Sequence, residues 1–239
     1  MRNNIVIVLA IALMLPALTF SQKTRFGMTM GMNFATWQGD DDQFATDLGQ
    51  GMSTVEGFND FNFTDKSRLG YNFGFFALIP VGKSLYLQPE ITYIQKGTKI
   101  SGNGEITVNS GWSNNTYTVK EWLTMQSDYI DINLLARYYL NQNGVRAYIS
   151  GGPGIAVLAR SKMKVKAEVD GESDVDTQDY DFFKSTDLNL NVAAGLEFSE
   201  SLNIEVRYQR GLTGIFENES DNAYSVRNSG VIINLSVIF

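Results

Sequence analysis

The sequence predicts an all-β protein, an eight-stranded antiparallel up-and-down barrel. The first observation is that eight segments place apolar residues at every second position, which is the period of a β-strand with two unlike faces. The second is that short and long connections alternate between these segments, three short and four long. The long connections therefore gather at one end of the barrel, and the two ends of the strand series lie at the other.

The clearest example is the hairpin between Tyr129 and Arg160. One face of its first arm is aliphatic or aromatic, and the other carries Asp131, Asn133 and Arg137. The residues Asn141-Gln-Asn-Gly144 supply a tight polar turn, and the second arm alternates in the same way up to Val157. This hairpin predicts strands four and five, with strand four beginning between Trp122 and Tyr129.

The other strands follow from the same alternation. They are expected at 24–37, 67–79, 85–100, 186–198 and 202–212, with the last one ending at Phe239. Short turns are predicted at 80–84, 141–144 and 199–201, and long loops at 38–66, 101–121, 161–185 and 213–227. No helical period is found after the first 21 residues, so no further helix is expected.

The N-terminal segment has the pattern of a signal peptide. Arg2 supplies a positive start, Ile5 to Leu15 form an apolar run, and small residues precede Gln22. A membrane-spanning helix needs roughly twenty apolar residues, which this run does not reach. We therefore expect a cleaved signal peptide at 1–21 and a single barrel domain at 22–239.

Composition narrows the function. The 239-residue chain has no Cys and no His, which excludes disulfides, thiolate or zinc sites of the usual kind and a Ser-His-Asp triad. Its net charge of −7 argues against a nucleic-acid partner, which would require clustered Lys and Arg. The acidic run Asp170 to Asp179 lacks the Gly and Glu of a calcium loop and is predicted to be a solvated loop. We expect no cofactor, no metal and no enzymatic activity.

The distribution of charge decides which face is outside. A soluble lipocalin-like barrel has an apolar interior, whereas a membrane barrel has an apolar exterior and a polar lumen. Here the apolar face of each strand is nearly free of charge over a length sufficient to cross the hydrocarbon core, and aromatic residues recur near strand ends. The sequence therefore predicts a transmembrane barrel with short periplasmic turns and long extracellular loops. The polar parity is expected to form a charge network in the lumen, made of Arg68, Glu90, Asp131, Arg137, Arg146, Glu197, Glu205 and Arg207.

The chain resembles a known family at this point. The four hairpins, the strand YIDINLLARYYL, the following AYISGGPGIAVL and the terminal aromatic Phe239 are similar to the PorT-like outer-membrane β-barrels of Bacteroidota. The resemblance covers 22–239 and implies insertion by the barrel-assembly machinery, with Phe239 as the terminal assembly signal. Asn234 occupies the place where a glycine is often found in that signal.

Together these observations predict an integral outer-membrane barrel with a salt-bridged, plugged lumen and acidic surface loops. It would act as a non-enzymatic structural or interaction module. Its expected partners are outer-membrane lipid, the barrel-assembly machinery during insertion and an unidentified envelope protein. The alternatives are a component of envelope assembly or protein secretion, a narrow pore, and a secreted lipocalin-like ligand-binding barrel.

Overall fold

A computed structural model describes residues 24–53, 58–109, 114–169, 172–179, 183–199, 201–216 and 225–239. The expected signal peptide at 1–21 lies outside the described residues. Nine strands and one helix are found in the described part of the chain: β1 (Arg25–Gln38), α2 (Asp41–Ser53), β2 (Phe58–Pro80), β3 (Leu85–Asn109), β4 (Asn114–Tyr139), β5 (Arg146–Val169), β6 (Glu172–Asp179), β7 (Thr186–Ser199), β8 (Leu202–Gly211) and β9 (Arg227–Ile238).

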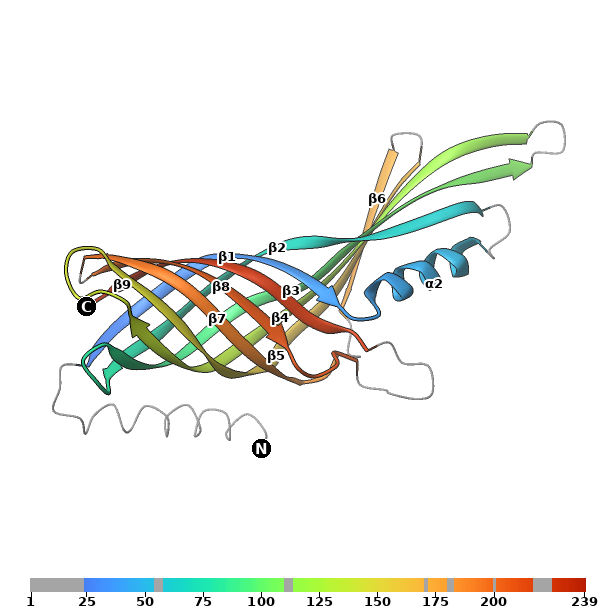
Figure 1. Cartoon of the computed structure of the whole chain (residues 1–239). Helices are drawn as coiled ribbons and strands as arrows, with labels where there is room; N and C mark the ends of the chain where they lie inside the picture. Colours follow the sequence, from blue (N-terminus) through green and yellow to red (C-terminus); the bar gives the residue numbers. More distant parts are fainter. Residues whose placement is uncertain are drawn as a thin grey trace.

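Eight of these strands close into a ring, which confirms the predicted fold class. The hydrogen-bonded order is β4-β3-β2-β1-β9-β8-β7-β5, and a pairing of β4 with β5 completes the circle (Figure 1). Every pairing is antiparallel. The pairing of β1 with β9 is continued by Phe239, whose N–H donates to the carbonyl of Phe26 at 2.8 Å. Closure matters because hydrocarbon offers no partner to an open strand edge.

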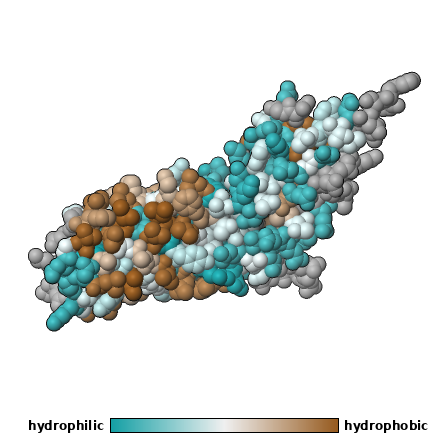
Figure 2. Space-filling model, turned by 45° about the horizontal axis from the view of Figure 1, so that its top comes forward, coloured by the Kyte–Doolittle hydropathy of each residue, from teal (hydrophilic) through white to brown (hydrophobic). Residues whose placement is uncertain are grey.

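The outer surface of the ring is apolar. Met30 and Val192, near the middle of their strands, have 63% and 60% of their surface exposed, and the large apolar residues of β8 and β9 alternate in the same way. Figure 2 shows brown, hydrophobic residues gathered over this part of the molecule on the face in view. The inward positions are polar and buried, which is the reverse of a lipocalin. The ring is therefore the lipid-spanning part of an outer-membrane barrel.

Strands β2 to β5 continue well beyond the apolar band, which the sequence did not predict. The second and third strands were expected at 67–79 and 85–100. The fourth was expected to begin at Trp122 or later, and the fifth to end by Arg160. The actual strands begin or end 8 or more residues further out, and β6 adds a further strand along the far end of β5. We call this part the extracellular extension: 58–68 of β2, 95–109 of β3, 114–128 of β4, 158–169 of β5, and β6. It projects away from the barrel at the upper right of Figure 1.

The reason for this error is a reversal of hydrophobic parity. Within the band, Ile130 and Leu134 of β4 point outward and Asp131 points inward. In the extension of the same strand, Leu123 and Met125 are buried on the inner side, and the outward positions are polar apart from Trp122. The apolar residues thus change faces where the strand leaves the lipid, and a search for apolar outward positions stops there.

The helix α2 also contradicts the expectation of a plain loop at 38–66. Its sequence is acidic and contains two glycines, which hides the helical period. Asp41 and Asp42 lie in the first turn, where their negative charge interacts favourably with the positive end of the helix dipole. Ala45 is buried in an apolar cluster with residues of β1, β3 and β4, so tertiary packing stabilises a helix of weak propensity. No helix in the described ranges is long and apolar enough to cross a bilayer.

The position of the apolar band can be tested with two matched valines. Val192→Lys places an ammonium group in hydrocarbon and should lower the free energy of unfolding from lipid vesicles by about 2–4 kcal/mol. Val175, also exposed but on β6, is the control, and Val175→Lys should change that free energy by less than about 0.5 kcal/mol. Denaturant titration followed by tryptophan fluorescence measures both. Equal losses would contradict the assigned band.

Candidate functional site

The lumen is the most highly organised polar region of the described structure. Inward positions of all eight ring strands converge on an axis, and in a barrel of this strand number side chains fill the interior. Because the strands are paired in known register, the polar side chains can be ordered from the periplasmic end upward. They form three successive levels.

The lowest level is centred on Glu197 of β7. Its carboxylate accepts from Arg25 at 2.9 Å, and also from Arg146 and from the hydroxyl of Tyr139. Arg25 and Arg146 keep about a fifth of their side-chain surface exposed, so this level faces the periplasmic mouth. Beside it, Phe76, Leu78 and Ile238 form a small buried apolar cluster.

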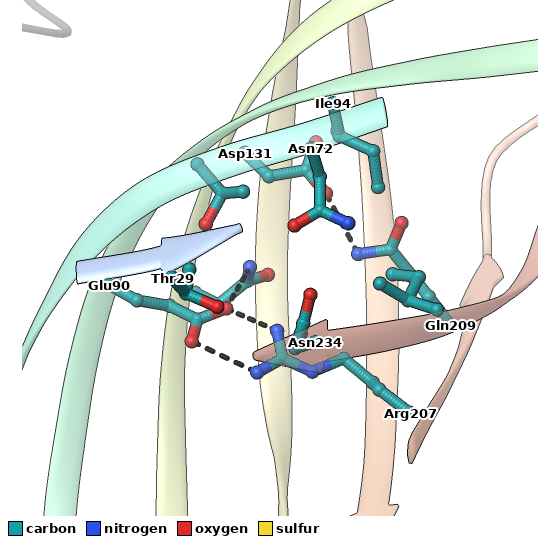
Figure 3. A pocket seen from close by; sticks show the side chains of 11 residues that line it. Thr29, Asn72, Glu90, Ile94, Asp131, Arg207, Gln209 and Asn234 are labelled. Carbon is teal, nitrogen blue, oxygen red and sulfur yellow. Dashed lines mark hydrogen bonds and ion pairs between the residues drawn. The ribbon is translucent and has the colours of Figure 1, made fainter. Parts of the chain in front are cut away.

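The middle level is centred on Arg207 of β8. Its guanidinium bridges two carboxylates. It donates from Nη2 to Glu90 at 3.0 Å, and its Nη1 also donates to Glu90 (Figure 3). From Nε it donates to Glu205 at 2.9 Å. Arg137 lies 3.7 Å from Glu205, and its guanidinium carbon is 3.9 Å from the ring centroid of Tyr148. The pair of Arg207 with Glu90 joins residues 117 positions apart, across the barrel.

The upper level is centred on Asp131 of β4. Lys96 places its ammonium 3.1 Å from Oδ2 of Asp131, and Gln209 donates to the same oxygen at 2.8 Å. Amide side chains continue from there: Asn191 donates to Asn133 at 3.1 Å and accepts from Gln209 at 3.0 Å. Both members of the Lys96–Asp131 pair are at least 96% buried, so each charge depends on the other.

Small residues make room for this network. Gly154 of β5 lies between the amide oxygens of Asn133 and Asn189, and a Cβ at that position would overlap both. Gly31 of β1 is enclosed in the same way by a backbone carbonyl of β9 and by Asn234. Side-chain volume in the lumen is therefore divided between long charged groups and glycines.

A small cavity remains between the middle and upper levels. Its volume is about 10 Å³, and its walls include Glu90, Asp131 and Arg207 (Figure 3). Buried polar atoms of Asn72 and Thr92 that have no protein partner also lie there. A cavity of this size has room for about one water molecule.

An apolar cluster closes the extracellular end of the lumen, and we call it the cap. Trp37 at the end of β1 is its centre, with ring centroids of Phe44, Phe183 and Phe216 at 5.7–6.3 Å in edge-on arrangements. The other buried members come from α2, β3, β4 and the segments that join the upper strand ends: Ala45, Ile100, Leu123, Met125, Ile215 and Val226.

Backbone hydrogen bonds fix the cap in place. The N–H of Lys184 donates to the carbonyl of Ile215 at 2.7 Å, and that of Ile215 donates to Val226 at 3.0 Å. At the edge of the cap, burial raises the pKa of Asp65, whose carboxyl accepts from the hydroxyls of Thr36 and Thr98.

Seven of the eight predicted lumen residues lie in the three levels described above. Arg68 does not join them: it is half-buried at an irregularity between β2 and β3 and donates to the backbone carbonyl of Lys96 at 3.0 Å. Sequence reasoning missed Arg25 and Lys96 as members of the network. Both occupy the same parity as the predicted residues, so the signal was present, but each lies at one end of its expected strand.

The acidic run of the third long connection forms a strand where it is described. Residues 172–179 pair with β5 as β6 and are exposed throughout. Within the described ranges, no group of three or more Asp and Glu side chains is arranged to hold a metal ion.

The chain is similar to one protein family and to several solved structures. Residues 20–217 match the model of a family described as the outer membrane protein beta-barrel domain. The attachment invasion locus protein Ail of Yersinia pestis is 11% identical over 91% of this chain and 100% of its own, with a TM-score of 0.40. Neisserial surface protein A is 11% identical over 91% of this chain and 100% of its own, with a TM-score of 0.39. OprG from Pseudomonas aeruginosa is 12% identical over 89% of this chain and 95% of its own, with a TM-score of 0.35. A search of curated proteins finds no match.

The Lys96–Asp131 pair allows a double-mutant test of the network. Lys96→Met leaves a buried carboxylate without its cation, and Asp131→Asn leaves a buried ammonium without its anion. Each should lower the free energy of unfolding by about 3–5 kcal/mol, because a lone buried charge is costly. The double variant restores neutrality and keeps an amide beside Gln209, so its loss should be well below the sum.

Denaturant titration in lipid vesicles measures all three variants. Lys164→Met, on the exposed outer surface of β5, is the control and should change stability by less than about 0.5 kcal/mol. Strictly additive losses would show that the two charges do not depend on each other.

Proposed function

From the premise that the chain belongs to the outer membrane protein beta-barrel domain family, we propose that this small outer-membrane barrel is a closed, non-enzymatic anchor for a folded extracellular module. The module is the extracellular extension together with α2 and the cap. Its function is contact with another component of the cell envelope. The finer resemblance to PorT-like barrels belongs to this proposal, and so does a role in envelope assembly or secretion.

The observation that carries the proposal is the occupied lumen beneath a sealed end. Three levels of paired charges fill the interior, and the remaining cavity has room for about one water molecule. Above them, Trp37 and its aromatic neighbours exclude water from the extracellular end. A conducting barrel requires a continuous aqueous path, and this arrangement supports an anchor over a narrow pore.

The same network argues against catalysis. A general base must be free to take a proton from a substrate, but Glu90, Glu197 and Glu205 are each held by at least one arginine in the interior. The chain has no His or Cys to take their place.

The terminal strand supports insertion by the barrel-assembly machinery as a further part of the proposal. Phe239 pairs with Phe26 through its backbone, and the residue is 73% exposed at the periplasmic rim. An exposed terminal aromatic at that edge is accessible to a factor that acts before the barrel closes.

Conductance separates the anchor from the pore. Purified protein incorporated into planar lipid bilayers should give no discrete current steps, because no hydrated ion fits the filled lumen. Heat-dependent mobility in electrophoresis shows that the incorporated protein is folded. Reproducible steps from folded protein would reject the closed anchor.

Loss of the upper hairpin tests the interaction role. Ser101 of β3 and Trp122 of β4 are directly paired, so replacing 102–121 with a short glycine-containing turn leaves the cap residues and the barrel ring in place. The shortened protein should still insert into the outer membrane, and cross-linked envelope complexes seen with the full chain should disappear. Unchanged complexes would show that the extension is not the contact surface.

A further inference from the structure

The outer face of the extracellular extension continues the lipid-facing surface of the barrel. On β3, Tyr93 lies on the outer surface and Lys99 is on the same side six residues further along the strand. At about 3.3 Å per residue this is roughly 20 Å along the strand, and less in height because the strands are tilted. The outward side chains just above the apolar band therefore lie at the level of the outer-leaflet head groups.

Six lysines occupy that outer face, and we call them the lysine face. The strand registers bring them together: Lys66 of β2 is opposite Lys99 of β3, Lys99 is opposite Thr124 of β4, and Thr124 is opposite Lys164 of β5. Directly paired residues share one face of an antiparallel sheet. The full set is Lys66, Lys99, Lys120, Lys162, Lys164 and Lys166. In Figure 2 the extension is predominantly hydrophilic, in contrast to the brown band.

This arrangement costs stability unless an anion is present. Lys66 and Lys99 are like charges in directly opposed positions, which is unfavourable in a sheet. Lys162, Lys164 and Lys166 follow one another at alternate positions of β5, on the same side. Only Lys166 of these five has a carboxylate within 4.0 Å among the described residues, Glu168 at 3.5 Å.

Three of the four acidic residues of β6 point away from the lysine face. Along β6, Glu172, Asp174 and Asp176 are opposite Val169, Ala167 and Val165 of β5, which belong to the inner side. The fourth, Asp179, is opposite Lys162, and Glu168 of β5 is opposite Lys120, so these two carboxylates lie on the lysine face. The six lysines outnumber them, and the side that continues the lipid-facing surface keeps an excess of positive charge.

Trp122 lies within the lysine face. It is opposite Ser101 on one side and Lys166 on the other, and the ammonium of Lys166 is 4.7 Å from the centroid of its ring. Tryptophan is enriched where a membrane meets water. Its position among lysines indicates contact with an interface that is both anionic and partly apolar.

We propose that the lysine face binds phosphate groups of the glycolipid that surrounds the barrel in the outer leaflet, that is, lipopolysaccharide. Several ammonium groups at strand spacing match an array of phosphates held in a membrane plane, and each lysine donates to phosphate as a compact charge. The phosphates would relieve the repulsion between Lys66 and Lys99. The lysine face is one side of the module, and the envelope protein partner proposed above would contact the rest of it.

Binding of fluorescently labelled lipopolysaccharide to the full-length protein in mixed micelles tests the proposal. The quadruple variant Lys66→Gln, Lys99→Gln, Lys164→Gln, Lys166→Gln should raise Kd by at least about tenfold, because four phosphate contacts lose their charge. The matched quadruple Lys→Arg variant should stay within about twofold, since it keeps the charges. Glu172→Gln with Asp174→Asn and Asp176→Asn, on the opposite face, should not weaken binding. Heat-dependent electrophoretic mobility confirms that each variant is folded.

Three results would overturn the proposal. One is a glutamine variant that binds as the wild type does, and another is dephosphorylated lipopolysaccharide that binds equally well. The third is a competitor that occupies the face more tightly than the lipid does. That competitor would be either the soluble polyanion inorganic polyphosphate or a second copy of the chain, detected by cross-linking. Affinity that falls as salt is raised, with phosphorylated lipid only, would support it.

Discussion

The fold depends on one constraint: in hydrocarbon, every backbone N–H and C=O must be paired within the protein. The ring meets it by joining β1 to β9, a pairing that Phe239 extends to the last residue. Closing eight strands makes the lumen narrow, so each inward side chain lies against side chains from across the barrel. The lumen charges follow from this narrowness. A buried charge without a counterion would be costly, and long arginines such as Arg207 reach carboxylates on distant strands.

Much of this could be predicted from the sequence, because side chains of a strand alternate between the lipid and the lumen at every second residue. Period-two alternation located the eight ring strands and placed Glu90, Asp131 and Arg207 inside. The pairs themselves could not be predicted. Which carboxylate faces Arg207 depends on the shear of the barrel, and strand shear is set by the sum of many registers. Lys96 was missed because it lies where β3 leaves the membrane, near the end of the strand that alternation defined.

The extension was missed for a physical reason of the same kind. A strand that passes from lipid to water must exchange its apolar face, since the solvent outside changes from hydrocarbon to water. Along β4, Ile130 and Leu134 face lipid, whereas Leu123 and Met125 face the cap. A search for strands with apolar residues on the outside therefore stops at that exchange. Helix α2 was missed because its glycines lower its helix propensity, which packing against the cap offsets. A reversal of parity within one continuous alternating run is therefore itself a sequence signal for a membrane boundary.

The reversal also explains why lysines gather on the outer side of the extension. Because the inner face is largely committed to the cap, most charged residues in the extended parts of β3 to β5 occupy the outer face; Glu121, opposite Ala167, is an exception. That face also carries carboxylates, Glu168 opposite Lys120 and Asp179 opposite Lys162. Three acids of β6 lie instead on the side of Val165 and Ala167, which leaves the lysines in excess on the outer face. Like charges in neighbouring positions of a sheet repel one another. An excess of positive charge is therefore more favourable beside an anionic surface than in water, and the outer leaflet next to the barrel is such a surface.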